Sequence, residues 1–210
     1  LLKAGEIERL KDLQWQGSPV YSVTKRGLLE LESRGEFLIA LHSATRKMPD
    51  RIQVFHALEL NAIRLSLACN ALLVSWQSEL EISSLNMAST SPFQKDYDAL
   101  VKVWVGDEPR EFALEYERSL KSAKHYESVR AALEGERRIE CVLYLTVDAN
   151  LLLAVLYHLT PIAKRLGFLT ARAFKEQLLA ASVTTQGDRA MVTLRDFLQY
   201  SHPLYIWAHD

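Results

Sequence analysis

Two neighbouring segments near residue 100 alternate apolar and polar positions. Residues 98–105 and 111–117 flank Gly106-Asp107-Glu108-Pro109, whose composition is typical of a hairpin turn. The apolar parity consists of Ala99, Val101, Val103, Val105, Phe112, Leu114 and Tyr116. The other parity carries Asp98, Lys102, Glu111, Glu115 and Glu117. The pattern predicts an antiparallel strand pair with one buried face and one charged face.

The register of this hairpin decides which carboxylates meet. The two apolar sets share one side of the sheet only if the numbers of opposed residues add to an odd value, as when a four-residue turn pairs Val105 with Arg110. Asp98 then lies opposite Glu117 and diagonal to Glu115, within reach of one ion. A register shifted by one residue would separate these carboxylates.

The segments before the hairpin predict a helix and a strand. Asp50 is expected to cap a helix over Arg51–Ala71. Its broad apolar stripe consists of Val54, Leu58, Ile63, Leu65, Leu67 and Leu72. Residues 72–82 alternate and predict a half-buried strand carrying Glu79. The stretch Ser83–Pro92, rich in Ser, Thr and Asn, is expected to be a loop.

The chain after Glu117 predicts further helices and strands. A helix follows at once, with its apolar side formed by Leu120, Ala123, Val129 and Leu133. The apolar run Ile139–Val147 is typical of a central strand covered on both faces. Asp148 is expected to cap a helix that Thr160-Pro161 divides or restarts and Gly167 ends. Phe168–Phe174 predicts a strand and a short helix, and Ala190–Tyr200 a last strand. This order indicates an α/β fold, a central mixed sheet flanked by helices.

The N-terminal part predicts a hairpin beside a short helix. A turn at Gln16–Pro19 separates two strands, and the second includes Tyr21-Ser22-Val23. Thr24 is expected to cap a helix that Gly35 ends, with Leu28, Leu29 and Leu31 on its buried side.

Charge and cysteine content narrow the function classes. The 210 residues carry a formal net charge of −1, so any surface for a polyanion must be a local patch. Cys69 and Cys141 have no zinc-like or disulfide-like spacing and are expected to be buried, which fits a reducing, cytoplasmic compartment. The apolar stretch Leu151–Ala163 is too short to span a membrane, and no secretory leader is visible. Because the chain starts at Leu1 rather than Met, native sequence is expected ahead of it.

The clustered carboxylates predict a site for a hard divalent cation. Asp98 and Glu115 are expected to bind Mg²⁺ or Mn²⁺, and Glu79 is expected to be a further ligand or to order a metal-bound water. Such an ion binds a phosphodiester oxygen and lowers the pKa of an attacking water. Arg118, Lys121 and His125 follow at helical spacing and form a side suited to a phosphate backbone. The alternative is a solvated basic face that neutralises nearby glutamates.

The N-terminal motifs resemble a winged-helix domain. The sequence Ala4-Gly5-Glu6-Ile7-Glu8-Arg9-Leu10, followed by Val20–Leu31 with its Tyr-x-Val-Thr-x-x-Gly pattern, resembles the end of a recognition helix, the wing and the next helix. The resemblance implies that residues 1–48 are the C-terminal part of a DNA-binding domain in which Lys25 and Arg26 contact DNA. A generic hairpin packed beside a helix is the alternative.

Residues 49–210 resemble the PD-(D/E)XK nuclease superfamily in the order of a helix, three carboxylate-bearing strands, a helix and a strand. Together with the winged helix, the chain resembles the replication-relaxation family of mobile-element proteins, whose H-x-L-x-x-N helix matches His56–Asn61. The resemblance covers about residues 1–175.

The superfamily motif maps onto four side chains. Asp98 corresponds to the metal-binding aspartate and Glu115 to the acidic residue of the (D/E)XK element. Glu117 stands where the motif has lysine, and Lys121 on the next helix is placed to supply that group. Tyr97 replaces the motif's proline.

The resemblance implies a DNA-binding protein of a mobile element or its control, acting as a Mg²⁺-dependent endonuclease. One alternative is a regulator whose degenerate nuclease fold serves a homodimer or another protein partner. Another is a structural domain with a solvated acidic face.

Overall fold

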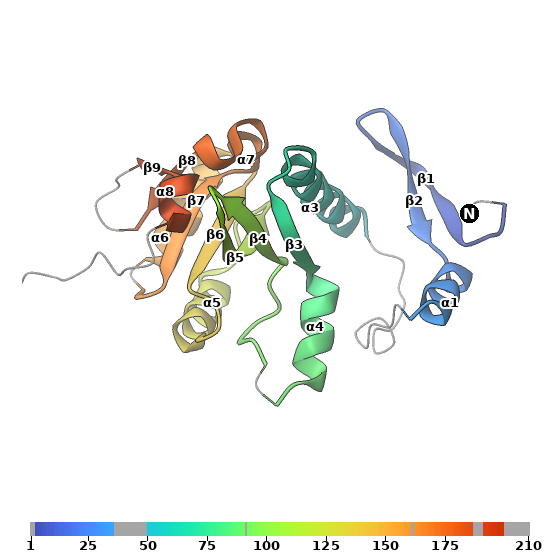
Figure 1. Ribbon diagram of the computed structural model, residues 1–210, viewed down its shortest axis with the longest axis horizontal. Helices are drawn as coiled ribbons and strands as arrows, with labels where there is room; N and C mark the ends of the chain where they lie inside the picture. The colour runs from blue at the N-terminus through green and yellow to red at the C-terminus, as the bar shows by residue number, and fades with distance from the viewer. Residues whose placement is uncertain (1–2, 36–49, 91, 161, 187–190, 200–210) are drawn as a thin grey trace, which may run out of the picture. The chain divides into compact units, whose positions relative to one another are not determined.

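The computed structural model describes residues 3–35, 50–90, 92–160, 162–186 and 191–199 (Figure 1). The chain divides into two units, residues 1–59 and 60–210. The predicted domain boundary at residue 48 lies outside the described residues.

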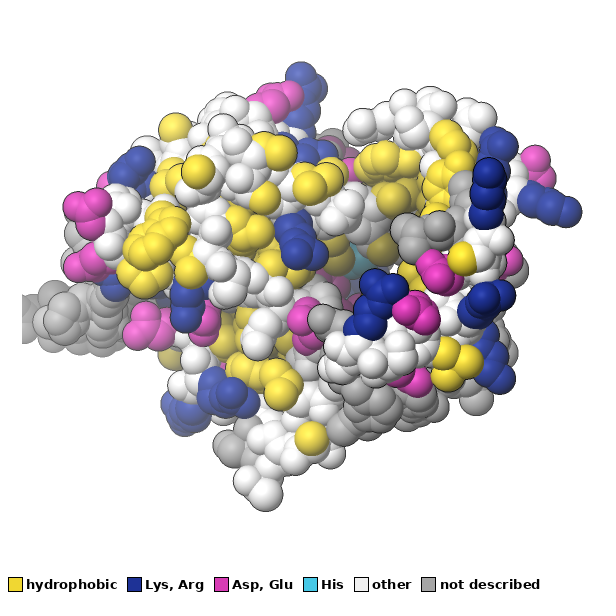
Figure 2. Space-filling model, turned by 45° about the vertical axis from the view of Figure 1, so that its right-hand side comes forward, with side chains coloured by type: hydrophobic (Ala, Val, Ile, Leu, Met, Phe, Trp, Pro, Cys, Tyr) yellow, Lys and Arg dark blue, Asp and Glu magenta, His cyan; other side chains and the backbone are white. Residues whose placement is uncertain are grey.

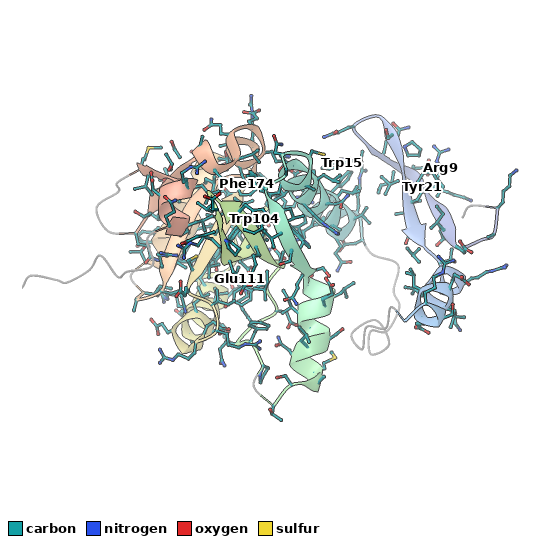
Figure 3. All side chains as sticks on the ribbon, viewed as in Figure 1. Arg9, Trp15, Tyr21, Trp104, Glu111 and Phe174 are labelled. Carbon is teal, nitrogen blue, oxygen red and sulfur yellow. The ribbon has the colours of Figure 1, made fainter. Side chains whose placement is uncertain are left out.

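The first unit contains the predicted hairpin. Strands β1 (Ile7–Trp15) and β2 (Ser18–Val23) are antiparallel, and Arg9 lies opposite Tyr21, as Figure 3 shows. The register shifts between Arg9 and Gln14. Gln16 and Gly17 both have positive φ, +49° and +79°, as a two-residue type I′ turn requires. The hairpin prediction is confirmed.

Helix α1 (Lys25–Ser33) begins and ends as predicted but packs differently. The Thr24 hydroxyl accepts a hydrogen bond from the Gly27 amide at 3.1 Å, and Gly35 follows the helix with a φ of +90°. Leu29 and Leu31 are exposed, and the buried residue of the helix is Gly27. The predicted leucine face is therefore wrong, because the hairpin meets the helix through its backbone at Gly27.

Helix α3 (Arg51–Cys69) spans both units. The Asp50 carboxylate accepts a hydrogen bond from the Gln53 amide at 2.8 Å, which confirms the predicted cap. Ile63 and Leu67 are the buried residues of the helix, whereas Leu65 is 52% exposed. Cys69 is exposed and Cys141 buried, so the prediction holds for one cysteine only.

A seven-stranded mixed sheet forms the centre of the second unit. Its strands lie in chain order: β3 (Leu73–Ser78), β4 (Ala99–Val105), β5 (Glu108–Glu117), β6 (Cys141–Thr146), β7 (Arg165–Thr170), β8 (Ser182–Thr185) and β9 (Met191–Thr193). Strands β5, β6 and β7 are parallel, and the remaining neighbours pair antiparallel. Strand β6 is central and buried throughout, as predicted. The α/β fold with a central mixed sheet is confirmed.

Helices cover both faces of this sheet (Figure 1). One face packs against α4 (Glu79–Ala88), α5 (Ala123–Gly135) and α6 (Ala149–Leu159). The other face packs against the second half of α3, α7 (Ala171–Gln177), the 3-10 turn η1 (Leu178–Ala180) and α8 (Leu194–Gln199). In the described part of the chain, no helix has both the length and the apolar character needed to cross a membrane.

The β4–β5 hairpin confirms the predicted faces and corrects the register. All seven residues of the apolar parity are buried in one cluster. Val105 pairs with Glu108 rather than Arg110, because Gly106 adopts a φ of +65° and closes a two-residue turn. A shift of two residues keeps each side chain on its face. Continued by one pair, this register places Asp98 opposite Glu115 rather than Glu117.

Two element boundaries around the hairpin differ from the prediction. Residues 79–82 belong to helix α4 rather than to a strand, because Glu81 accepts a hydrogen bond from the Ser78 amide at 2.6 Å and closes a capping box. The predicted loop at Ser83–Pro92 is helical as far as Ala88.

The helix after Glu117 also starts later than predicted. Ser122 caps α5, and Leu120 and Ala123 are exposed. Of the predicted inward residues, Val129 is half-buried and Leu133 is buried.

The last third of the chain keeps the predicted cap and changes the elements that follow. The Asp148 carboxylate accepts a hydrogen bond from the Leu151 amide at 2.9 Å, which confirms the cap of α6. This helix ends at Leu159, Pro161 lies outside the described residues, and Gly167 lies inside β7. The predicted strand and short helix over 168–174 are confirmed as β7 and α7.

The expected last strand is instead the short β9 followed by α8. Ala190 and Tyr200, the ends of the predicted strand, lie outside the described residues.

Candidate functional site

The carboxylates lie together at one edge of the sheet. Asp98 immediately precedes β4, and Glu115 and Glu117 lie in the last three residues of β5. Because β4 runs antiparallel to β5, its start lies beside the end of β5. The parallel neighbour β6 ends at the same edge with Thr146, which pairs with Glu117. In open α/β sheets, ligands bind at the carboxyl ends of parallel strands.

Asp98 fixes the start of β4 against β5. Its Oδ2 atom accepts a hydrogen bond from the Tyr116 amide at 2.7 Å, although the two residues are 18 positions apart. The carbonyl oxygen of Asp98 accepts a hydrogen bond from the Glu79 amide at 3.1 Å. The backbone of Glu79 therefore lies at the site, while Glu79 itself is exposed in the first turn of α4.

Glu115 is a buried carboxylate with a lysine partner. Only 9% of its surface is exposed, and its Oε1 atom lies 2.5 Å from Nζ of Lys95. Burial raises the pKa of Glu115 to about 7, Lys95 opposes this rise, and the negative charges of Asp98 and Glu117 add to it. The carboxyl of Glu115 therefore exchanges its proton near neutral pH.

Glu117 has a similar environment one step further along the same face. It is buried, and its Oε2 atom lies 3.6 Å from Nζ of Lys121. Burial raises the pKa of Glu117, Lys121 opposes this, and Asp98 adds to the rise. The positive field of His125 also favours the charged form of Glu117.

Tyrosines form the buried side of the site. Tyr144 on β6 pairs with Glu115 on β5, so both side chains face the same side of the sheet. Burial raises the pKa of Tyr144 and of Tyr97, and the Glu115 carboxylate raises both further. Both phenols are therefore neutral. Among the described residues, the Tyr144 hydroxyl has no hydrogen-bond partner.

The structure brings some of the predicted site residues together and leaves others apart. Asp98, Glu115, Glu117 and Lys121 come together, with His125 close enough to influence Glu117. Glu79 contributes its backbone amide, and Arg118 is half-buried directly after β5.

Two further predicted residues belong to the other unit. Lys25 and Arg26 are exposed in the first turn of α1. They stay predictions as DNA contacts.

Lys95 is the site residue that the sequence patterns did not identify. It lies in the segment before β4, three positions ahead of Asp98, and no strand or helix period reaches it. A lysine shortly before a predicted metal-binding aspartate is the only signal for it. That signal did not separate Lys95 from the other basic residues of the chain.

The donor set fits a divalent cation that takes few protein ligands. Within the described ranges, no three His, Cys, Asp or Glu side chains form a ready ligand cluster. Mg²⁺ commonly uses only one or two carboxylates and keeps several waters. Asp98 and Glu115 carry carboxylate oxygens of this kind, and the ammonium groups of Lys95 and Lys121 lie at Glu115 and Glu117.

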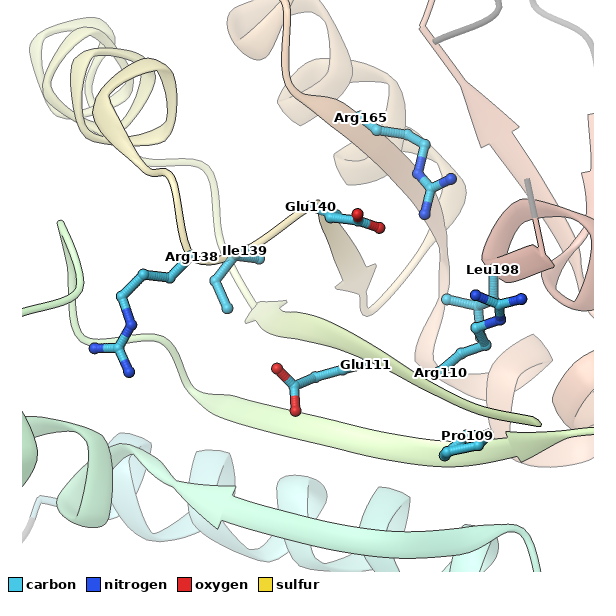
Figure 4. A pocket seen from close by; sticks show the side chains of 8 residues that line it. All are labelled: Pro109, Arg110, Glu111, Arg138, Ile139, Glu140, Arg165 and Leu198. Atoms are coloured by element: carbon cyan, nitrogen blue, oxygen red, sulfur yellow. The ribbon is translucent and has the colours of Figure 1, made fainter. Parts of the chain in front are cut away.

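A separate pocket lies at the amino ends of the parallel strands (Figure 4). It has a volume of about 300 Å³, and Arg110, Glu140 and Arg165 project into it. Its charged lining is mixed, with Arg110, Arg138, Arg165, Glu111 and Glu140. This mixture favours no single charge class of ligand.

On the face shown in Figure 2, acidic and basic side chains are interspersed, in keeping with the net charge of −1. No protein-family model matches this chain, and no curated protein or solved structure matches it either.

Proposed function

We propose that this chain is a DNA-binding protein of a mobile element or its control circuit, whose second unit cleaves phosphodiester bonds with the help of a divalent cation. The observation that carries the proposal is the meeting of Asp98, Glu115 and Glu117 at the carboxyl end of β5, with Lys95 at the buried Glu115. Such a combination of oxygen ligands and an ammonium group suits a phosphate ester.

The order of elements supports the same proposal. Helix α3, strands β3, β4 and β5, helix α5 and strand β6 occur in the order that the PD-(D/E)XK resemblance implies, with one difference. Helix α4 stands between β3 and β4 and carries Glu79, which the resemblance assigns to a strand. Asp98 immediately precedes the second strand and Glu115 lies near the end of the third, close to the positions that the resemblance gives to the acidic residues of the motif.

Asp98 and Glu115 are the residues that hold the cation in this proposal, and Mg²⁺ or Mn²⁺ suits their oxygen atoms. When bound, such an ion lowers the pKa of a coordinated water and offsets the charge on the phosphate. The Oδ2 atom of Asp98 accepts a hydrogen bond from the Tyr116 amide, which fixes the direction of this carboxylate.

Lys95 and Lys121 have different roles in this proposal. Lys95 takes the place of the motif lysine, since its ammonium group already lies at Glu115 and can orient a water or a phosphate oxygen. Lys121 pairs with Glu117. Glu117, whose pKa is raised by burial, accepts the proton of the attacking water.

Basic residues in both units are proposed to hold the DNA. Arg118, Lys121 and His125 follow directly after the carboxylates along the chain. Lys25 and Arg26 occupy the exposed first turn of α1 beside the hairpin. Lysine and arginine supply most contacts to DNA phosphates, which position a protein without reading its sequence.

A plasmid cleavage assay tests the proposal. Supercoiled plasmid with the purified chain and Mg²⁺ or Mn²⁺ should become nicked or linear, and chelation should stop this. Glu115→Gln should abolish cleavage. Glu111→Gln is the matched control, because Glu111 is exposed on the same strand and pairs with Lys102. Equal cleavage by wild type and Glu115→Gln would refute the assigned site.

A second function is favoured by the same ion pairs. Glu115 and Glu117 each already face a lysine, so the charge at the site is largely neutralised without a cation. This favours a regulator that binds DNA and uses the nuclease-like unit for dimerisation or partner binding. A salt-sensitive gel shift without cleavage, together with no Mn²⁺ binding in calorimetry, would select this function.

A further inference from the structure

The segment that carries Lys95 is held from two sides. Residues 92–98 belong to the connection between α4 and β4 and contain no helix or strand. Lys95 nevertheless has a defined place, because only 19% of its side chain is exposed and its ammonium group lies 5.2 Å from the centre of the Tyr97 ring. Such placement of a long side chain needs a fixed backbone underneath.

One side of this support comes from α4. The Asn86 side-chain oxygen accepts a hydrogen bond from the Phe93 amide at 2.8 Å. The Asn86 side-chain amide donates to Oδ1 of Asp96 at 2.6 Å. A single side chain thus bridges the residues that enclose Gln94 and Lys95.

The other side comes from the end of α5. Glu136 is only 2% exposed, and its Oε2 atom accepts a hydrogen bond from the Gln94 amide at 3.0 Å. Its Oε1 atom accepts from the Arg138 amide at 2.6 Å, and the Arg138 guanidinium lies 3.8 Å from the centre of the Phe93 ring. The carboxylate of Glu136 therefore joins the end of α5 to the residue next to Lys95.

We propose that Glu136 is a positioning residue that holds Lys95 at Glu115. The use of Lys95 in catalysis rests on the proposed function, but the positioning itself does not. A buried carboxylate is costly to desolvate, and hydrogen bonds from two backbone amides offset that cost. A hydrophobic residue of similar size would fill the same space. Only an acceptor can fix the Gln94 amide and with it the direction of the Lys95 side chain.

Amine labelling of the metal-free protein tests the positioning directly. The acylation rate of each lysine is read by mass spectrometry at fixed pH. Glu136→Ala should raise the rate at Lys95 by about fivefold, the factor that one lost hydrogen bond of ordinary strength corresponds to. Glu136→Gln keeps one acceptor oxygen and should give a smaller increase. Lys102, which pairs with Glu111 on the β4–β5 hairpin, serves as the internal reference.

A matched control separates positioning from general loosening. Glu134→Ala changes an exposed glutamate on the same helix, two positions earlier, and should leave the Lys95 rate unchanged. Helix content by circular dichroism identifies any variant that fails to fold. For Glu136→Ala, Glu136→Gln is then the folded substitute.

Mn²⁺ binding and cleavage report separately on the proposed function. If both the inference and that function hold, Glu136→Ala lowers the turnover of cleavage and has no further effect in a Lys95→Met background. Faster labelling of Lys95 with no Mn²⁺ binding by any form would refute the proposed function and leave the positioning role intact. An unchanged Lys95 rate in folded Glu136→Ala and Glu136→Gln would overturn the inference.

Discussion

At the residue scale, Glu115 couples the site to pH. Its folded-state pKa of about 7 lies above the 4.5 of an ordinary glutamate, so folding favours the protonated form. The stability contributed by Glu115 is therefore fully present below about pH 4.5 and is lost as pH rises through about 7.

Glu115→Gln should remove this loss of stability at rising pH, because the glutamine side chain does not titrate. Between about pH 5 and pH 8, wild type should lose up to about 3 kcal/mol of unfolding free energy that Glu115→Gln retains. Urea unfolding at several pH values measures the difference. Glu111→Gln should follow wild type, because Glu111 is exposed. Parallel curves for wild type and Glu115→Gln would contradict the pKa assignment.

The ion pair between Lys95 and Glu115 should contribute more to the free energy of unfolding than an exposed ion pair does. Lys95→Met leaves the buried Glu115 carboxylate without its ammonium partner, and we expect about 1–3 kcal/mol of destabilisation at pH 8. The double variant Lys95→Met/Glu115→Gln should recover most of this loss. A thermodynamic cycle of unfolding free energies measures the coupling, and additive effects of the two substitutions would contradict a direct pair.

At the element scale, periodicity predicted the faces of the sheet better than the ends of its elements. The parity of residues 98–117 placed the seven residues of the apolar set on one buried face, because strands have a strict period of two. The register was wrong by two residues, since the length of a turn depends on whether Gly106 adopts a positive φ. The sequence allowed both turn lengths.

A local helix cap explains a second difference between the prediction and the structure. The alternating residues 79–82 have the parity of a strand, yet Ser78 and Glu81 form a capping box that starts α4. Lys95 could not be predicted for a different reason. Its place depends on hydrogen bonds that the Phe93 and Gln94 amides donate to Asn86 and Glu136, which lie outside this segment and carry no periodic signal.

Gly27 lies where the backbone of Glu6 approaches helix α1, so the glycine of this short motif reflects a tertiary contact. The Thr-x-x-Gly pattern marked the start of α1, and the structure gives the reason. A Cβ atom at Gly27 would lie 2.1 Å from the carbonyl oxygen of Glu6, which also accepts a hydrogen bond from the Thr24 amide. Backbone atoms cannot move aside as the tip of a flexible side chain can.

We therefore expect Gly27→Ala to open the junction between the hairpin and α1. Amide hydrogen exchange in residues 6–33 should accelerate by about five- to 150-fold, because overpacking costs about 1–3 kcal/mol. Gly135→Ala is the matched control, since its nearest contact would be 3.5 Å from a Gln94 side-chain atom. Unchanged exchange in Gly27→Ala would contradict the close approach, in which a Cβ atom at residue 27 would lie 2.1 Å from the Glu6 carbonyl oxygen.

At the scale of the whole molecule, charge decides how DNA can be bound. With 25 Lys and Arg residues against 26 Asp and Glu residues, the chain as a whole does not attract a polyanion. The proposed DNA binding therefore requires a few local contacts, and its affinity should fall with salt in proportion to their number. Lys25 and Arg26 are the contacts proposed for the first unit, where both are exposed.

Replacing both residues measures that contribution. For Lys25→Gln/Arg26→Gln, the slope of log K against log salt concentration should become shallower by about 2, and affinity should fall uniformly across DNA sequences. Fluorescence anisotropy with duplexes at several salt concentrations provides the slope. Arg172→Gln is the matched control, because Arg172 is an exposed arginine on α7 paired with Glu176 and has no proposed contact. If the double variant kept the slope of wild type while Arg118→Gln/Lys121→Gln reduced it, DNA would be held by the carboxylate-bearing unit, and the winged-helix role of the first unit would be wrong.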